Sequence, residues 1–224
     1  MSTLYMVATP IGNLEDITYR AVEVLKNVDI IACEDTRQSM KLLNHYGIKK
    51  HLISVRARNE KNSAPGVVKL LDEGKDIAYI SDAGTPVLSD PGSILIQAVR
   101  KSEHNITPIP GPNAFGALVS VSGFVGKTVT FEGFLPQKSG KRKKRLDELL
   151  SREESFIIYE SPYRIVKLLG ELAEINSERH LLLGREITKN FEEFIQGTSA
   201  EVLENMSTRT TIKGEFAILV AGKE

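Results

Sequence analysis

Short apolar runs alternate with amphipathic segments through the first half of the chain, and this alternation constrains the fold more than any other feature. Five runs have the length and composition of buried strands: 4–8, 30–33, 52–55, 77–80 and 106–109. The segments between them carry apolar residues at helical spacing. Such regular alternation of strands and helices predicts a largely parallel sheet with helices on both of its faces.

The expected helices have recognisable ends. Asp16 is placed to cap the first helix, whose apolar face is formed by Ala21, Val22, Leu25 and Val28. A second helix contains Met40, Leu42 and Leu43 and ends at Gly47, since glycine commonly follows the last helical residue. Two more helices are expected near 67–73 and 93–101.

The second half of the chain has more strands than crossover helices. Strands are expected at 129–134, 156–159, 180–184, 193–196 and 216–220, with helices near 146–150, 164–172 and 200–205. This excess of strands predicts a mixed sheet. A length of 224 residues suits two domains of roughly 100 residues each. We therefore expect a two-domain α/β protein, with an N-terminal domain at 1–115 and a C-terminal domain at 116–224.

Composition narrows the range of functions. The 29 basic and 29 acidic residues leave no net charge, so only a local cluster can indicate a polyanionic partner. The single cysteine, Cys33, lies in an apolar run and is expected to be a buried, inert thiol. The four histidines lack the spacing of metal ligands, so no metal site is expected. No signal peptide or membrane-spanning stretch is recognisable, which predicts a cytoplasmic protein.

Four loops follow expected parallel strands and are rich in glycine, proline and acidic residues: 8–14, 34–37, 81–92 and 108–114. Ligands of open parallel sheets bind beyond the carboxyl ends of the strands, so together these loops predict a binding cleft. Each loop alone is also compatible with a tight turn or a helix cap. The chain has neither the dinucleotide-binding glycine motif nor a P-loop, which argues against those two classes of enzyme.

Taken in order, the segment 7–18, which contains the first loop, the other three loops and four later segments resemble the ribosomal RNA small subunit methyltransferase I family of the tetrapyrrole methylase superfamily. The later segments are 131–136, 159–162, 185–189 and 213–215. The resemblance covers essentially the whole chain. It implies two α/β domains with S-adenosylmethionine in the cleft between them, and a homodimer. It also implies 2′-O-methylation of a cytidine ribose in small-subunit (16S) ribosomal RNA.

The resemblance also assigns residues to the cofactor. Carried over position by position, the cofactor contacts would be Pro10, Asp82, Ala83, Gly84, Val87, Asn113, Ala114, Tyr159, Glu160 and the backbone at Gly214 and Glu215. Some positions depart from the family pattern. The stretch 56–60 reads Arg-Ala-Arg-Asn-Glu where histidines are common, and Tyr163 and Phe191 also stand where histidine is common. Many relatives continue past the last strand into a C-terminal extension, whereas this sequence ends at Glu224.

Two groups of residues are candidates for the chemistry and for RNA binding. A carboxylate that accepts the hydrogen bond of a ribose hydroxyl would assist methyl transfer, and the candidates are Glu34, Asp35 and Glu60. The run 138–145 contains six basic residues, Lys138, Lys141, Arg142, Lys143, Lys144 and Arg145. Basic residues oppose the dipole at a helix start, so a flexible strip that contacts RNA phosphates is the favoured interpretation.

Aromatic residues make up only 6% of the chain, with no tryptophan, so an aromatic platform for bases is not expected. The expected partner is small-subunit ribosomal RNA or the assembled small ribosomal subunit. Two other functions remain open. The same fold could methylate a tetrapyrrole or another small molecule, or the loops could bind a ligand without turnover.

Overall fold

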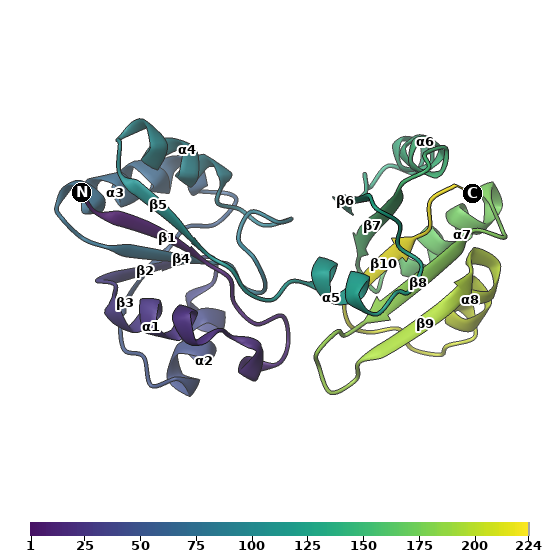
Figure 1. The fold of residues 1–224 in the computed structure, drawn as a ribbon, viewed down its shortest axis with the longest axis horizontal. Helices are drawn as coiled ribbons and strands as arrows, with labels where there is room; N and C mark the ends of the chain where they lie inside the picture. The colour runs from purple at the N-terminus through teal and green to yellow at the C-terminus, as the bar shows by residue number, and fades with distance from the viewer. Residues whose placement is uncertain (224) are drawn as a thin grey trace. The chain divides into compact units, whose positions relative to one another are not determined.

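The computed structural model describes residues 1–223, which form two compact units that divide between Asn113 and Ala114 (Figure 1). Each unit contains one five-stranded sheet with its own hydrophobic core. No helix in the described part of the chain is long and apolar enough to cross a membrane.

The N-terminal unit contains the predicted parallel sheet. Its strands lie in the order β3-β2-β4-β1-β5, and every neighbouring pair is parallel. Their bounds are β1 Thr3–Val7, β2 Ile30–Cys33, β3 His51–Ser54, β4 Ile77–Ile80 and β5 Asn105–Ile109. All five lie within about one residue of the expected apolar runs. The prediction of a parallel sheet is therefore confirmed.

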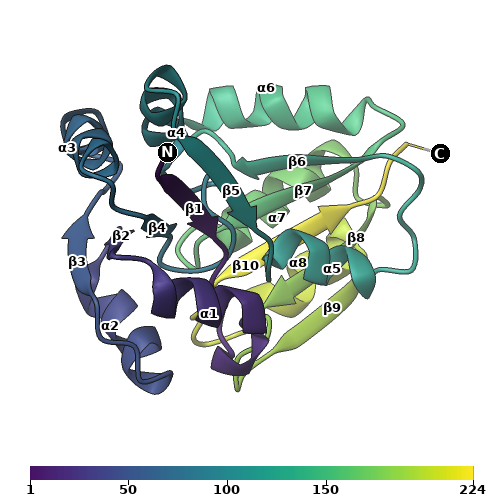
Figure 2. The ribbon, with the colours of Figure 1, turned by 60° about the vertical axis from the view of Figure 1, so that its left-hand side comes forward.

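Helices cover both faces of this sheet, as predicted (Figure 2). The bounds are α1 Tyr19–Asn27, α2 Thr36–His45, α3 Glu60–Asp72 and α4 Ser93–Lys101. Ala21 and Leu25 of α1 pack with Val7 and Ile31 on one face. Val67 and Leu71 of α3 and Leu95 and Val99 of α4 pack with Leu4, Ala32 and Tyr79 on the other. Alternate strand residues thus supply two cores, because successive side chains point to opposite faces.

Two helix starts in the N-terminal unit differ from the sequence prediction. Asp16 ends a short 3₁₀ turn, Leu14–Asp16, and the side chain of Thr18 caps α1 by accepting a hydrogen bond from the backbone of Ala21 at 3.1 Å. Helix α3 begins at Glu60, well before the expected start, and contains Pro65. Its first turn is polar, so apolar periodicity could not reveal it.

The C-terminal unit contains a mixed sheet, again as predicted, with the order β6-β7-β10-β8-β9. Strands β6 and β7 are parallel and the remaining neighbours are antiparallel. The bounds are β6 Val129–Phe134, β7 Ser155–Glu160, β8 His180–Arg185, β9 Glu193–Thr198 and β10 Phe216–Val220.

Three helices of this unit, α6 Ser139–Leu150, α7 Ile165–Ile175 and α8 Ser199–Ser207, supply leucine, isoleucine, valine and methionine side chains to one large core. The short helix α5, Ala114–Ser120, approaches the sheet at β8. A Cβ on Gly184 would lie 2.9 Å from the side chain of Leu118 in α5, so glycine permits this close approach.

Candidate functional site

The four glycine- and proline-rich loops of the N-terminal unit are joined at the carboxyl end of the parallel sheet. Thr9 and Gly84 exchange two backbone hydrogen bonds, of 2.9 and 3.0 Å, which link the first loop to the third. The backbone of Asp35 donates to Oδ1 of Asp82 at 3.0 Å, which links the second loop to the third. The hydroxyl of Thr85 donates to the carbonyl of Pro112 at 3.4 Å, which links the third loop to the fourth.

The third loop, 81–92, has an unusual backbone. Gly84, Val87, Ser89 and Gly92 have φ angles of 81°, 75°, 67° and 131°. A β-branched residue with positive φ is a genuine outlier, and such strain concentrates at binding and catalytic sites. Val87 is also 36% exposed, although its side chain is apolar. The loop therefore presents a fixed, strained backbone with an accessible apolar side chain.

Glu60 holds this loop in place. Its carboxylate is 4% exposed, and Oε1 accepts hydrogen bonds from the backbone of Gly92 at 3.0 Å and of Leu95 at 2.9 Å. These amides belong to the start of α4, where a negative charge is favourable. Glu60 thus connects α3 to the third loop, which is a structural task for one of the three catalytic candidates.

Asp35 also has a structural task. Its side chain caps α2 by accepting from the backbone of Arg37 at 2.9 Å, and it pairs with the guanidinium of Arg37 at 3.1 Å. Hydrogen bonds from Arg37 hold the pKa of the Asp35 carboxyl below its ordinary value. One of the two adjacent acids at the end of β2 is therefore a helix cap, which is one of the roles that the sequence left open for this loop.

Glu34 is in a different electrostatic environment. Burial, and then the negative charges of Asp90, Asp82 and Glu60, raise the pKa of its carboxyl to about 7. A carboxyl with this pKa exchanges its proton near neutral pH, as a general base must. The neighbouring Cys33 is buried, as predicted, and burial raises the pKa of its thiol. In residues 1–223, no group of three or more His, Cys, Asp or Glu side chains is arranged to hold a metal ion.

In the C-terminal unit, Tyr159 and Glu160 end β7. Glu160 is 2% exposed, and its Oε1 accepts from the backbone of Ser161 at 2.7 Å and from Nε of Arg164 at 2.8 Å. Oε2 of Glu160 and Nη1 of Arg164 are buried and have no hydrogen-bond partner among the described residues. Buried polar atoms without partners are uncommon and mark a place where a ligand can supply the missing bond.

The turn after β8 is hydrogen-bonded to the loop that contains Gly214 and Glu215. The backbone of Glu186 donates to the carbonyl of Glu215 at 3.0 Å, and the backbone of Glu215 donates to Oε1 of Glu186 at 3.0 Å. Gly214 has a φ of 100°, and a Cβ there would lie 2.5 Å from Glu186. Lys189 bridges both glutamates, at 2.8 and 3.0 Å. The family resemblance includes the segment that contains Glu186 and Lys189, but it assigned no role to either residue.

The basic run is part of α6 instead of a flexible strip, which corrects the prediction. Arg142 is 3% exposed and pairs with Glu171 through two bonds, of 2.6 and 2.7 Å. Its remaining nitrogen donates to the carbonyls of Pro136 and Gln137. Arg142 is therefore buried, with four of its five N–H donors bonded within the protein, which contradicts its assignment to RNA binding. Arg142 is buried because α7 supplies Glu171 as its partner, and the polar sequence at the start of α6 does not indicate this contact.

Two further basic residues of the run have acidic partners. Lys143 pairs with Glu174 at 2.6 Å, and Arg145 pairs with Glu132 at 2.7 Å and with Glu148 at 3.0 Å. In contrast, Lys138, Lys141 and Lys144 are exposed, and no ion pair joins them to another described residue. Among the described residues, these three lysines, at the N-cap and in the first turns of α6, are thus the members of the run without an acidic partner.

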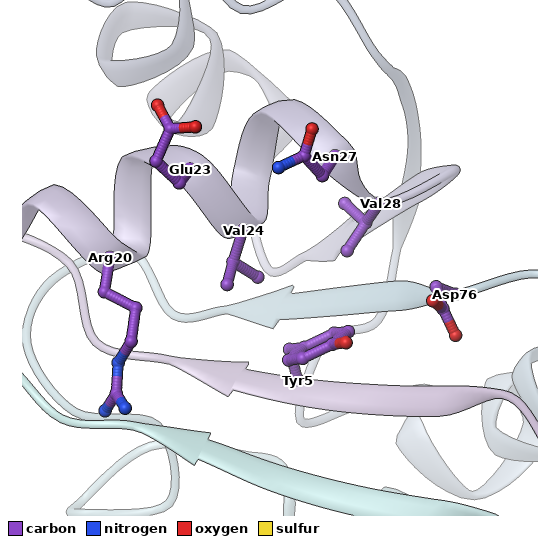
Figure 3. A pocket seen from close by; sticks show the side chains of 7 residues that line it. All are labelled: Tyr5, Arg20, Glu23, Val24, Asn27, Val28 and Asp76. Atoms are coloured by element: carbon purple, nitrogen blue, oxygen red, sulfur yellow. The ribbon is translucent and has the colours of Figure 1, made fainter.

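A hollow in the N-terminal unit lies apart from these residues (Figure 3). It is formed between α1 and the sheet, and its lining residues are Tyr5, Arg20, Glu23, Val24, Asn27, Val28 and Asp76. None of the predicted site residues lines it. It is therefore not part of the candidate site.

Comparisons with known proteins support the fold and the family. The sequence model of the family described as Tetrapyrrole (Corrin/Porphyrin) Methylases matches residues 3–203. Among solved structures, the methyltransferase CobJ has a TM-score of 0.75 at 17% identity, covering 99% of this chain and 95% of that one. The uroporphyrin-III C-methyltransferase of Thermus thermophilus has a TM-score of 0.69 at 17% identity, covering 99% and 94%. Fold and family model define an S-adenosylmethionine-dependent methyltransferase of the tetrapyrrole methylase class.

Relatives of higher sequence identity identify one family within this class. Three of these relatives are named ribosomal RNA small subunit methyltransferase I. The one from Borrelia garinii subsp. bavariensis is 47% identical to this chain, over 97% of this chain and 98% of the relative. The relative in Thermotoga maritima is 43% identical over 100% of both chains, and the one in Bacillus subtilis is 42% identical over 99% of this chain and 76% of its own. The chain belongs to the ribosomal RNA small subunit methyltransferase I family, as its motifs predicted.

Features of both units fit the methyl donor of this class. In the N-terminal unit, the strained third loop exposes the apolar side chain of Val87 and is joined to the loops that contain Pro10 and Asn113. In the C-terminal unit, Glu160 retains an unpartnered buried oxygen that can accept a hydrogen bond. Each feature matches a need of a zwitterionic, partly apolar cofactor.

Proposed function

We propose that this protein methylates small-subunit ribosomal RNA and that the acceptor is the 2′-hydroxyl of a cytidine ribose. The observation that carries the proposal is its identity of 42–47% with proteins named for that RNA, over nearly the whole chain. The likeness to tetrapyrrole enzymes is much weaker, at 17% identity, and supports only the shared fold.

The residues proposed to hold S-adenosylmethionine come from the joined loops of the N-terminal unit, from the end of β7 and from the loop before β10. They are Pro10, Asp82, Ala83, Gly84, Val87, Asn113, Ala114, Tyr159, Glu160, Gly214 and Glu215. When bound, the cofactor supplies an already activated methyl group. The protein then has to orient the ribose hydroxyl, exclude water and accept the proton. Positioning alone can lower such a barrier by about 7–11 kcal/mol in favourable cases.

Glu34 is the best supported of the three candidate bases. Asp35 is engaged by the α2 cap and by Arg37, and Glu60 is engaged by the amides at the start of α4. Glu34 instead has a pKa of about 7, so it is substantially ionised at neutral pH yet basic enough to accept a hydroxyl proton. General-base assistance of this kind is typically worth about 10²–10⁴-fold in rate.

RNA binding is assigned to the lysines of α6 that have no acidic partner. Lys138, Lys141 and Lys144 are exposed and three residues apart, so the two within the helix lie one turn from each other. Lysines placed in this way can contact successive phosphates. Arg142, Lys143 and Arg145 are not included, because carboxylates already neutralise them.

The direct test uses methyl-tritiated S-adenosylmethionine with small ribosomal subunits that lack the modification, with free ribosomal RNA, with a tetrapyrrole and with no acceptor. We expect label in 2′-O-methylcytidine after digestion of the RNA to nucleosides. Label on a base would contradict the ribose assignment. Label in the tetrapyrrole alone would contradict RNA as the acceptor. The homodimer and the cytoplasmic location expected from the sequence stay predictions.

A further inference from the structure

Four aromatic rings in the C-terminal unit form a continuous row. Phe115 contacts Phe131 with ring centroids 5.7 Å apart, Phe131 contacts Tyr159 at 5.0 Å, and Tyr159 contacts Phe134 at 6.0 Å. All three contacts are edge-to-face, which is a favourable arrangement of aromatic rings. The sequence, with few aromatic residues, did not predict such a cluster. The fold gathers it from α5, β6 and β7.

A β-bulge places Phe134 at the end of the row. In the pairing of β6 with β7, Phe131 lies opposite Ile157, but Gly133 lies opposite Ile158, so one extra residue is inserted. Without the bulge, Gly133 would lie opposite Tyr159. With it, Phe134 takes that position and joins the face that carries Phe131. Gly133 has a φ of 68°, a conformation that glycine adopts at little cost. Bulges often redirect a side chain beside a functional site.

Phe134 is 56% exposed, although Tyr159 contacts its ring. An exposed phenylalanine costs free energy in water, and hydrophobic burial does not explain why the bulge turns this one outward. The contact with Tyr159 restricts the ring, so a planar partner would meet a surface that is already ordered.

The lysines without acidic partners begin a few residues after Phe134 in the sequence. Lys138 is four residues away, which limits the separation of the two Cα atoms to roughly 14 Å. Arg142 fixes the intervening segment to α6 through the carbonyls of Pro136 and Gln137. An exposed ring beside lysines without acidic partners is complementary to a single-stranded nucleic acid, which offers base faces and phosphates in alternation.

We propose that Phe134 stacks on an unpaired base of the RNA substrate while Lys138 and Lys141 contact the neighbouring phosphates. The inference rests on the proposed RNA methylation and names the recognition element for it. Stacking does not discriminate strongly among bases, so Phe134 would orient a nucleotide within the strand, whatever its base.

The test is a double-mutant cycle in binding. The proteins are the wild type and Phe134→Ala, and the probes are a fluorescent single-stranded 12-nucleotide oligocytidylate and the same ribose-phosphate chain without bases. We expect Phe134→Ala to weaken binding of oligocytidylate about 5- to 150-fold, the range expected for the loss of one base–aromatic stack. Binding of the abasic chain should not change. Phe134→Tyr should retain most of the affinity, because the ring is preserved.

A matched control is Phe191→Ala. Phe191 is 73% exposed and precedes β9, at the opposite edge of the sheet from β6. Its loss should leave both affinities unchanged. Equal affinities of wild type and Phe134→Ala for oligocytidylate would overturn the proposal. Equal weakening of both probes would also overturn it, as would a change in sedimentation on Phe134→Ala, which would assign the ring to contact with a second copy of the chain.

Failure of this inference is distinguishable from failure of the proposed function. If the wild type methylates ribosomal RNA and Phe134→Ala does so with the same KM, the stacking proposal alone is wrong. If the wild type transfers no methyl group to RNA, the proposed function is wrong, whatever Phe134 binds.

Discussion

Glu34 in the N-terminal unit and the ion-paired glutamates of the C-terminal unit lie in opposite electrostatic environments. At the carboxyl end of the parallel sheet, Glu34 lies among other acids, and burial and like charges raise its pKa to about 7. In the C-terminal unit, Glu171 and Glu193 are paired with Arg142 and Arg209. Burial alone would raise the pKa of Glu171, but hydrogen bonds from Arg142 and Ser139 bring it below its ordinary value, and hydrogen bonds from Arg209 lower the pKa of Glu193. The same side chain is thus ready for proton transfer in one unit and fixed as a structural anion in the other.

This difference indicates a division of tasks. The N-terminal unit brings several acidic side chains and a strained backbone together at the ends of its strands, which suits chemistry. The C-terminal unit pairs three of the six basic residues in its basic run with carboxylates and leaves the other three, together with the nearby ring of Phe134, exposed, which suits binding. Substitutions in the two units should therefore affect different steps.

The largest expected effect is on catalysis. Glu34→Gln removes the proposed base with little change in volume, and we expect kcat to fall by about 10²–10⁴-fold. In the wild type, kcat should rise with pH and level off above about pH 7, because Glu34 accepts a proton only when ionised. The variant should lose this dependence. Single-turnover rates between pH 5.5 and 8.5 measure both, and Asp35→Asn serves as the neighbouring control.

The next largest effect is on stability. Arg142→Ala leaves Glu171 buried and unpaired, and we expect the free energy of unfolding to fall by about 3–5 kcal/mol. The double variant Arg142→Met, Glu171→Leu should recover most of this loss, because hydrophobic replacement of a whole buried pair is often neutral. Urea unfolding measures both. If the single and double variants lose equal stability, the pair is not the cause.

A smaller loss is expected in the third loop of the N-terminal unit. Gly92→Ala places a Cβ 2.9 Å from the side chain of Val87 and forces alanine to a φ of 131°. We expect a loss of about 2–3 kcal/mol. Gly66→Ala is the matched control, because Gly66 lies within α3 with nothing near its Cβ, and it should gain about 0.5–1 kcal/mol. Thermal unfolding of the two variants should therefore shift in opposite directions.

The smallest expected effect is on the salt dependence of RNA binding. Replacing Lys138, Lys141 and Lys144 by alanine should reduce the slope of log affinity against log salt by about 2, since each phosphate contact on a single strand contributes roughly 0.7. Lys143→Ala should change the slope very little, because Glu174 already neutralises Lys143. An equal change per lysine in the two variants would show that the ion pairs do not separate these residues.

The sequence predicted the strands well because buried strands are short apolar runs with clear ends. It predicted less of the helices whose first turns are polar, such as α3 and α6, since periodicity is visible only in apolar positions. The joining of the four loops was predictable from a general rule, because parallel strands bring their carboxyl ends to one edge of the sheet.

The tasks of individual site residues were not predictable in the same way. Glu34, Asp35 and Glu60 look equivalent in the sequence, and only the amides of Arg37, Gly92 and Leu95 distinguish them. Arg142 is separated from Glu171 by 29 positions, so its burial could not be read locally. The place of Phe134 in the aromatic row depends on a one-residue bulge, for which alternation along β6 gave no sign.

The division of tasks is tested most directly by single-turnover methylation of small-subunit ribosomal RNA as a function of RNA concentration, with the wild type, Glu34→Gln and the triple lysine variant compared. The account predicts that Glu34→Gln lowers the rate at saturating RNA and leaves the half-saturating concentration unchanged. It predicts the reverse for the lysine variant. A lysine variant slow at saturation, or a Glu34→Gln variant that differs only in half-saturation, would contradict it.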